Sequence, residues 1–393
     1  MSKWEMASLK NVTTLMTDGD WVESKDQSVE GIRLVQTGNI GEGEYLDKSK
    51  NAKYISDKTF VRLNCTEVFE GDVLVSRLPA PVGRACILPQ CSTRMITTVD
   101  CTIMRFDEAQ CILGFFVYFS MSPNYLFQVT KHLAGSTRVR ISRKNLETVV
   151  IPLPPLETQK QIAKTLDTAA ELLAMRKQQL AELDNLIKST FNDMFGDPVA
   201  NEKGWNLKPI RDFSVVKIGP FGSLLHVEDY IEGGFPLVNP SHIIGDKIVP
   251  DTRLTLSGEK FKELKSYIMK KGDIVVGRRG EIGRCAVVDD EGFLCGTGSM
   301  FIRIENDYLP MLLQRIISSN SMRARLEHQS VGVTMKNLNA ATISSLVVPI
   351  IPLHLQIQYA DIVTKIEQQK ALVKKAIDET QYLFDSLISE YFE

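Results

Sequence analysis

Basic residues gather before the middle of this 393-residue chain in a pattern that suits an anionic partner. Arg138, Arg140, Arg143 and Lys144 lie within seven residues, and the first two arginines alternate with Val and Ile. This alternation predicts one basic face of an extended segment. Guanidinium groups make bidentate contacts to phosphate oxygens and to guanine. The cluster therefore predicts contact with nucleic acid, with a solvated edge as the alternative.

Further basic and polar residues complete the set of candidate DNA contacts. Arg77 and Arg278 each end a strand that begins with Gly-Asp, and a framework arginine tied to a carboxylate is the alternative there. Besides the cluster above, the candidates are Arg77, Arg278, Arg279, Arg323, Arg325, Lys336, Gln36, Asn39, Asn239 and Ser241. Amide and hydroxyl side chains suit adenine edges and phosphates. Phe221, in a Gly-Pro-Phe-Gly turn, is either a wedge between bases or, as we favour, a residue that packs in its turn.

The chain lacks three sequence motifs that are typical of methyl transfer and ATP binding. It has no Asn/Asp-Pro-Pro-aromatic motif for adenine methylation and no Phe-x-Gly-x-Gly for a methyl donor. It also lacks Gly-x-x-x-x-Gly-Lys-Ser/Thr for ATP. Its seven cysteines include no Cys-x-x-Cys pair, so buried thiols are expected and no metal site. We expect no enzymatic activity and no cofactor on this chain.

Composition sets only broad limits. Lys and Arg total 46 against 48 Asp and Glu, so the net charge of -2 gives no support to a uniformly basic surface. The most apolar run, residues 111–121, is far shorter than the roughly 20 residues of a membrane span. The first residues lack the apolar segment of a signal peptide. We expect a cytoplasmic protein of two or three domains.

The most informative feature is an internal duplication at a spacing near 200 residues. Gly-Asp-Val-Leu-Val-Ser-Arg at 71–77 matches Gly-Asp-Ile-Val-Val-Gly-Arg at 272–278, and a Gly-Arg pair follows each segment. From residue 135 onward the offset is a constant 197, with 15 identities over residues 135–195. Each copy therefore consists of a β-rich globular part, a proline-rich connector and a long helix.

The two helices share one heptad pattern. Residues 157–195 contain neither Pro nor Gly, and they predict a helix of about 58 Å. Alternating steps of four and three give an apolar seam on each helix. The seam contains Ile162, Leu166, Leu173, Leu180, Leu183 and Ile187, then Val363, Ile366, Val373, Ile377, Phe384 and Leu387. Two equivalent stripes in one chain are most simply buried against each other in antiparallel order, with homodimerisation as the alternative.

The predicted fold is α+β, with two similar mixed α/β domains joined by two long helices. These helices form an intramolecular antiparallel coiled coil with pseudo-two-fold symmetry. We expect a first globular domain at 1–150, a connector and helix at 151–200, a second globular domain at 201–347, and a connector and helix at 348–393. Duplex DNA presents the same groove about every 34 Å. Two divergent heads on a rigid rod thus predict recognition of two different short sequences across a fixed gap.

The whole chain resembles the specificity subunits of type I restriction-modification systems. The resemblance rests on residues 272–280, on Ile-Gly-Pro-Phe-Gly-Ser at 218–223, and on Ile-Pro-Leu-Pro-Pro-Leu-Glu-Thr-Gln at 151–159. Asp-Gly-Asp-Trp at 18–21 and Gln-Thr-Gly-Asn-Ile at 36–40 add to it. The resemblance implies two target recognition domains, each reading one half of an asymmetric bipartite DNA target. It also implies that the helices set the gap and dock the modification subunits.

The partners follow from the same resemblance. They are double-stranded DNA, two modification subunits that methylate adenine with S-adenosylmethionine, and two restriction subunits in the full complex. The restriction subunits would use ATP and Mg²⁺, so every cofactor would be bound outside this chain. A coiled-coil scaffold or clamp that binds only protein is the alternative function, and it would show no sequence-specific DNA binding. A stand-alone methyltransferase is disfavoured by the missing motifs.

Overall fold

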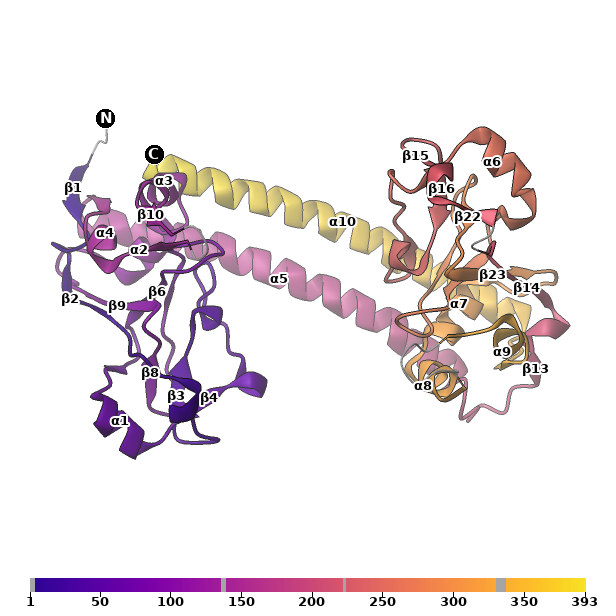
Figure 1. Ribbon diagram of the computed structural model, residues 1–393, viewed down its shortest axis with the longest axis horizontal. Helices are drawn as coiled ribbons and strands as arrows, with labels where there is room; N and C mark the ends of the chain where they lie inside the picture. Colours follow the sequence, from indigo (N-terminus) through magenta and orange to yellow (C-terminus); the bar gives the residue numbers. More distant parts are fainter. Residues whose placement is uncertain (1–3, 136–138, 222–223, 330–336) are drawn as a thin grey trace. The chain divides into compact units, whose positions relative to one another are not determined.

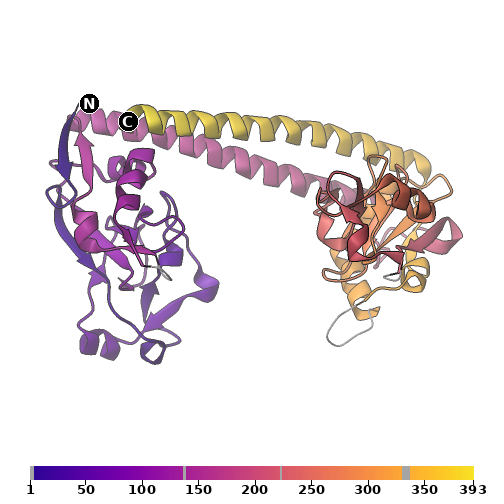
Figure 2. The same cartoon turned by 45° about the horizontal axis from the view of Figure 1, so that its top comes forward.

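The structure is a computed structural model that describes residues 4–135, 139–221, 224–329 and 337–393 (Figures 1 and 2). Two of the predicted DNA contacts, Arg138 and Lys336, lie outside the described residues. The chain divides into two compact units. The first unit is Met1–Gln179 with Val373–Glu393, and the second is Leu180–Leu372. Each unit therefore contains one globular part and a section of both long helices.

The globular part of the first unit contains two four-stranded sheets. One sheet is antiparallel throughout, and its strands in spatial order are β2 (Thr13–Asp18), β9 (Cys101–Phe106), β6 (Val73–Ser76) and β7 (Ala85–Ile87). The other contains one parallel pair, β3 with β8, and its strands in order are β4 (Lys53–Ile55), β3 (Ile32–Val35), β8 (Met95–Thr97) and β5 (Glu67–Val68). β6 is buried along its whole length, as its continuous run of β-branched and apolar residues predicts.

Short helices and two small ladders complete the first globular part. The helices are α1 (Asp57–Leu63), α2 (Leu113–Phe119), α3 (Pro123–Lys131) and α4 (Arg143–Glu147). The ladders pair β10 (Leu133–Ala134) with β11 (Arg140–Ile141), and β1 (Glu5–Ser8) with β12 (Val150–Leu153). β12 contains the connector's Pro152, and its pairing with β1 ties the start of the globular part to its end.

The second unit repeats the antiparallel sheet of the first unit strand for strand, and it has a mixed sheet that differs from the first at its edges. Its antiparallel sheet has the order β14 (Ser214–Ile218), β23 (Ser299–Ile304), β20 (Ile274–Gly277), β21 (Cys285–Val287). Its mixed sheet has the order β15 (Tyr230–Ile231), β19 (Thr255–Leu256), β16 (Phe235–Val238), β22 (Leu294–Cys295), with β16 and β22 parallel. The remaining pairs are β13 (Leu207–Pro209) with β24 (Val347–Pro349), and β17 (Ile243–Ile244) with β18 (Lys247–Ile248). The helices are α6 (Gly258–Glu263), α7 (Pro310–Ser318), α8 (Asn320–Gln329) and α9 (Ala340–Ser344).

Both long helices form, and they are paired in antiparallel order within each unit. α5 is Leu156–Phe195 and α10 is Leu353–Phe392. In the first unit the N-terminal part of α5 shares a core with the C-terminal part of α10, where Ile162 and Leu166 lie with Phe384 and Phe392. In the second unit the C-terminal part of α5 shares a core with the N-terminal part of α10. The predicted α+β fold with an intramolecular antiparallel coiled coil is confirmed (Figure 1).

All residues of the predicted seam are buried or half-buried. Arg176 and Lys370 are two of the polar side chains that interrupt this seam, and both have partners on the other helix. Arg176 donates hydrogen bonds to the carbonyl oxygen of Ala376 and to the hydroxyl of Thr380 in the first unit. Lys370 forms an ion pair with Asp184 at 2.7 Å in the second unit. Partners that exist only in one alignment of the helices favour a single register.

The repeated Gly-Asp turn is explained by one ion pair that both units contain. Gly71 and Gly272 have φ of +83° and +90°, which favours glycine. The aspartate that follows, Asp72 in the first unit, is 4% exposed and accepts two hydrogen bonds from Arg105, at 2.7 and 2.9 Å. Asp273 and Arg303 repeat this arrangement at 2.9 and 2.5 Å. The pair links β6 to β9 and β20 to β23, so it belongs to the framework of each globular part.

A buried glutamine joins each connector to its globular part. Gln159, 1% exposed, accepts a hydrogen bond from the Ile112 N–H and donates two to the carbonyl oxygens of Gln110 and Pro154, all at 2.9 Å. In the second unit Gln356 accepts from Leu309 N–H at 2.7 Å and donates to the carbonyl oxygen of Ile351 at 2.8 Å. The first turn of each helix is thereby fixed to its own globular part.

The cysteines depart from expectation at one position. Six are buried, whereas Cys91 is exposed because it lies in the loop between β7 and β8. Burial raises the pKa of the Cys86 thiol to about 12. Within the ranges that the structure describes, no group of three or more His, Cys, Asp or Glu is suited to a metal ion. No described helix is both long enough and apolar enough to cross a membrane.

Candidate nucleic-acid interface

The loop after β3 presents the first predicted polar contacts. Gln36 begins a single 3₁₀ turn, Thr37–Asn39, and lines grooves on both sides of this turn. Asn39 is 7% exposed, and its amide is used inside the loop: Oδ1 accepts from the Gln36 N–H and Nδ2 donates to the Leu46 carbonyl oxygen, both at 2.9 Å. The structure thus gives Asn39 the role of shaping the loop and leaves Gln36 as its candidate contact.

Arg84 holds this loop in place, although we had not included it among the candidates. The side chain is 9% exposed and donates to four carbonyl oxygens, two on each of two loops. Two belong to Thr37 and Ile40, and the others to Leu78 and Pro81. Burial lowers the pKa of Arg84. The repeated Gly-Arg pair was the sequence signal for this residue.

Arg77 is a framework residue in this structure. It is 8% exposed, lies 3.6 Å from Asp18 and donates to the carbonyl oxygen of Val99 at 2.5 Å. A guanidinium with these partners is not presented to a groove of DNA. The structure therefore favours the alternative that we gave for this position, an arginine tied to a carboxylate.

Two grooves border Gln36, and one of them is basic. The first, about 650 Å³, is lined by Trp21, which is 69% exposed, and by residues 98–100. The second, about 270 Å³, is lined by Lys48 and Lys53. The Lys48 ammonium lies over Gly38, 3.4 Å from where a Cβ would stand. Sequence reasoning missed these residues; the signal was three lysines within residues 48–53.

The cluster at 138–144 is only partly extended. β11 ends at Ile141, and Ser142 caps α4 by accepting from the Asn145 N–H, so the expected single extended face is wrong beyond residue 141. Arg143 is engaged by Glu147 at 2.8 Å and by Asp18 at 3.6 Å. Arg140 and Lys144 are exposed. These two remain the candidate phosphate contacts of this segment.

The second unit has an equivalent loop with different side chains. Asn239 begins the 3₁₀ turn Pro240–His242, and its N–H donates to His242 Nδ1 at 3.3 Å. His242, 6% exposed, therefore corresponds to Asn39. Ser241 is exposed within the turn. Arg284 donates to the Pro240 carbonyl oxygen at 3.1 Å, as Arg84 does to Thr37.

The arginines of the second unit divide into engaged and exposed side chains. Arg278 donates to the Leu338 carbonyl oxygen at 3.0 Å, and burial together with the neighbouring Arg279 lowers its pKa. Arg323 pairs with Glu281 at 2.7 Å. Arg279 is exposed and Arg325 half-buried. Arg279 and Arg325 are thus the better placed candidates for phosphate contact.

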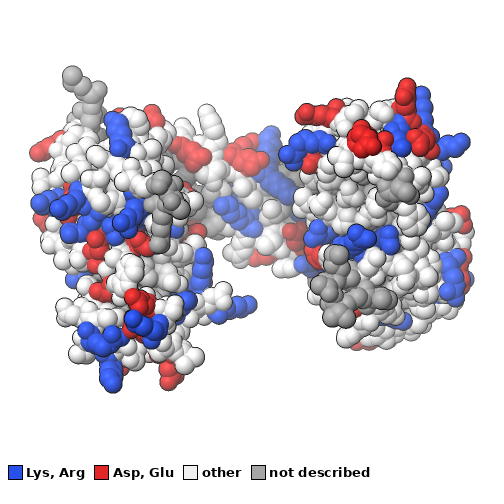
Figure 3. All heavy atoms as spheres, in the orientation of Figure 1, with Lys and Arg blue, Asp and Glu red and all other residues white. Residues whose placement is uncertain are grey.

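Phe221 does not pack within its turn as we had favoured. Its side chain is 67% exposed. On the face that Figure 3 shows, Lys and Arg side chains are interspersed with Asp and Glu over both globular parts. This agrees with the net charge and leaves local loops as the candidate interface.

The fold and these loops define a class of protein: a duplicated chain with two similar heads, divergent loops, and two long helices in antiparallel pairing. The family model described as "Type I restriction modification DNA specificity domain" matches residues 1–185 and 202–381. The chain belongs to this family.

Individual relatives agree with the family. The chain is 24% identical to the type I restriction enzyme EcoKI specificity subunit of Escherichia coli K12, over 99% of this chain and 88% of that protein. It is 22% identical to the MjaVIII specificity subunit of Methanocaldococcus jannaschii, over 70% of this chain and 66% of the relative, just under two thirds of its length. A type I restriction-modification S subunit structure from M. genitalium superposes with a TM-score of 0.54 at 16% identity, covering 100% of this chain and 96% of that one.

Proposed function

We propose that this chain is the DNA-recognition subunit of a type I restriction-modification complex. In this proposal each globular part reads one half of an asymmetric bipartite target. One observation carries the proposal. The framework of the two heads is the same, down to the ion pairs that the buried Asp72 and Asp273 form with Arg105 and Arg303. The loop side chains that border the candidate grooves differ.

Two kinds of contact have separate roles in this proposal. Exposed cations at the loops, Lys48 and Arg140 in one head and Arg279 in the other, contact phosphates and set the register. Such contacts do not depend on sequence and weaken as salt rises. Gln36 and Ser241 are the candidates for reading base edges. Differences between these loops would make the two half-sites differ.

The helices have two roles in the proposal: they set the gap between half-sites and dock two modification subunits. Exposed apolar residues on them support docking, since such residues mark interaction sites when they cluster. Leu372, Tyr382 and Leu383 on α10 are 62%, 78% and 51% exposed, and Met175 on α5 is 59% exposed.

Catalysis belongs to the partners in this proposal. S-adenosylmethionine would be bound by the modification subunits, and ATP with Mg²⁺ by two restriction subunits in the full complex. The chain itself would neither methylate nor cleave DNA. Methyl transfer by the purified chain alone would contradict this.

The experiment is to map methylated adenines in host DNA with and without the gene for this chain. The proposal predicts loss of one asymmetric bipartite motif. Unchanged methylation, together with no sequence-specific DNA binding by the assembled complex, would favour the scaffold or clamp that binds only protein.

Variants sharpen the test on the assembled complex. Lys48→Ala should weaken duplex binding about equally for all sequences and reduce the salt slope by about 1. The matched control is Lys10→Ala, which removes an exposed lysine from the turn after β1, away from both grooves. If the two variants show the same duplex affinity and the same salt dependence, Lys48 does not contact DNA.

A further inference from the structure

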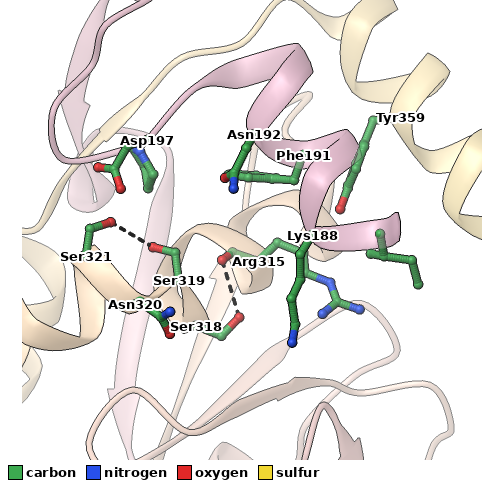
Figure 4. A pocket seen from close by; sticks show the side chains of 12 residues that line it. Lys188, Phe191, Asn192, Asp197, Arg315, Ser318, Ser319, Asn320, Ser321 and Tyr359 are labelled. Carbon is green, nitrogen blue, oxygen red and sulfur yellow. Dashed lines mark hydrogen bonds between the residues drawn. The ribbon is translucent and has the colours of Figure 1, made fainter. Parts of the chain in front are cut away.

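A cavity of about 300 Å³ lies in the second unit, where α5, α7, α8 and α10 meet. Ile187, Lys188 and Phe191 on α5, Arg315 on α7 and Tyr359 on α10 contribute to its wall. Figure 4 shows Lys188 and Arg315 on the same side of the cavity, with the Tyr359 hydroxyl directed toward them. None of these residues takes part in the candidate DNA interface described above.

Two buried donors in this wall have no acceptor among the described residues. Tyr359 is 0% exposed, and its hydroxyl makes no hydrogen bond. The Nε of Arg315 is also buried without a hydrogen bond, although its Nη2 pairs with Asp246 at 2.9 Å. Burial raises the pKa of Tyr359 to about 12, so its hydroxyl keeps its proton. Buried polar groups almost always have a partner, and two such donors at one cavity indicate that an acceptor binds there.

The charge of the wall favours a negatively charged acceptor. Lys188 is exposed at the cavity mouth and has no ion-pair partner in the part of the chain that the structure describes. The ten-residue α8 begins at the cavity, and the partial positive charge of its N-terminus attracts anions. Among the described residues that line the cavity, Asp197 is the one with a carboxylate. One of its oxygens accepts from the N–H groups of Val199 and Ala200, at 2.8 and 3.0 Å.

The duplication supplies a comparison within the same chain. Gln159 accepts from the Ile112 N–H and Gln356 from the Leu309 N–H, so the offset of 197 extends to α2 and α7. At this offset Arg315 corresponds to Tyr118 and Lys188 to Asp385. In the first unit Tyr118 donates to Asp167 Oδ1 at 2.6 Å, and its ring lies 6.0 Å from that of Phe384. A tyrosine, Tyr118, and a carboxylate, Asp385, thus occupy the two positions at which the second unit has cations. The cationic cavity is therefore a feature of the second unit and not of the shared framework.

We infer that this cavity binds a small oxyanion of the phosphate type, held by Lys188, Arg315 and the Tyr359 hydroxyl. The volume, at the lower end of ligand pockets, admits inorganic phosphate or the phosphate group of a small molecule. The phosphate groups of the DNA backbone are oxyanions of the same type, and the experiment distinguishes them from a free phosphate.

The test is isothermal titration calorimetry of the full chain with inorganic phosphate at constant ionic strength. The wild type should bind phosphate saturably. Tyr359→Phe keeps the volume and removes only the hydroxyl, and Lys188→Met removes the charge. Each should weaken binding about tenfold or more, because hydrogen bonds to charged groups exceed neutral ones. Lys177→Met, an exposed lysine elsewhere on α5, is the control and should bind as the wild type does.

A second arm measures duplex binding by the chain with its modification subunits. If free phosphate does not bind but Tyr359→Phe weakens duplex binding while Lys177→Met does not, the oxyanion is a DNA phosphate. If the variants match the wild type in both arms, the cavity holds water only and the inference is overturned. The phosphate arm needs no DNA, so its outcome is independent of the proposed recognition function.

Discussion

Replacing Gln159 by leucine should detach the first helix from its globular part at a measurable cost in stability. The substitution keeps a side chain of similar size but leaves the Ile112 N–H and the carbonyl oxygens of Gln110 and Pro154 without partners. An unsatisfied buried group costs about 1–3 kcal/mol. Because two of the three hydrogen bonds are only partly buried and the one to Pro154 is buried, we expect a loss of about 3 kcal/mol in total.

Calorimetry of the full chain measures this loss. For a unit of this size 1 kcal/mol shifts Tm by roughly 2–4 °C, so Gln159→Leu should lower the transition of the first unit by roughly 6–12 °C. The control is Gln161→Leu, two residues further on and exposed, which should change stability by less than about 0.5 kcal/mol. Gln356→Leu repeats the test in the second unit. If Gln159→Leu is as stable as Gln161→Leu, the glutamine does not join helix to globular part.

Three further predictions concern the framework, the helices and the thiols. Arg105→Met removes the cation from the buried Asp72, which keeps only the hydrogen bond from the Phe69 N–H, and it should destabilise the first unit by about 2 kcal/mol; an unchanged melting curve would contradict the framework role. Deleting one heptad from each helix, residues 177–183 and 374–380, shortens the rod by about 10 Å, about three base pairs. The gap between methylated half-sites should shrink or specific binding should fail; the original gap at full affinity would show that the rod is not the spacer. Cys91 should be the thiol that maleimide modifies first at neutral pH, because it is exposed, and mass spectrometry of the digested protein checks this.

Burial of thiols also predicts the direction of a pH effect. The pKa of Cys86 is raised from 9.0 to about 12 in the folded state, so folding favours its protonated form. The contribution of this thiol to the stability of the folded state is complete below its pKa in the unfolded chain, near 9. This contribution is lost as the pH rises toward 12. Cys86→Ala should therefore reduce the fall in Tm between pH 9 and pH 11. An identical pH profile for the variant would contradict this assignment.

The sequence was sufficient for the long helices because their signals are local. The absence of Gly and Pro over residues 157–195 predicted a helix that the structure finds at Leu156–Phe195. Gly196 ends it with φ of +76°, a conformation that favours glycine. The heptad pattern then selected the face of each helix that is buried. Tertiary contacts were needed only to bring the two faces together.

The loops could not be predicted in the same way. Whether Asn39 contacts DNA or shapes its loop depends on the Leu46 carbonyl oxygen, which folding brings to it. Whether Arg77 is exposed or buried depends on the Val99 carbonyl oxygen, which folding brings to it from another segment. Lys48 belongs to no periodic pattern in the sequence. Only the fold brings its side chain to the turn that follows Gln36. Roles of the individual DNA contacts remain predictions for the same reason.

Exchange of one head is the measurement that tests the central claim most directly. Residues 1–150 would be replaced by the matching segment of a relative, and methylated adenines would be sequenced in cells that contain the modification subunits. Base contacts are local and worth about 1–3 kcal/mol each, so independent heads predict one altered half-site, with the other half-site and the gap unchanged. Alteration of both half-sites, or of neither, would contradict two independent reading heads on a common pair of helices.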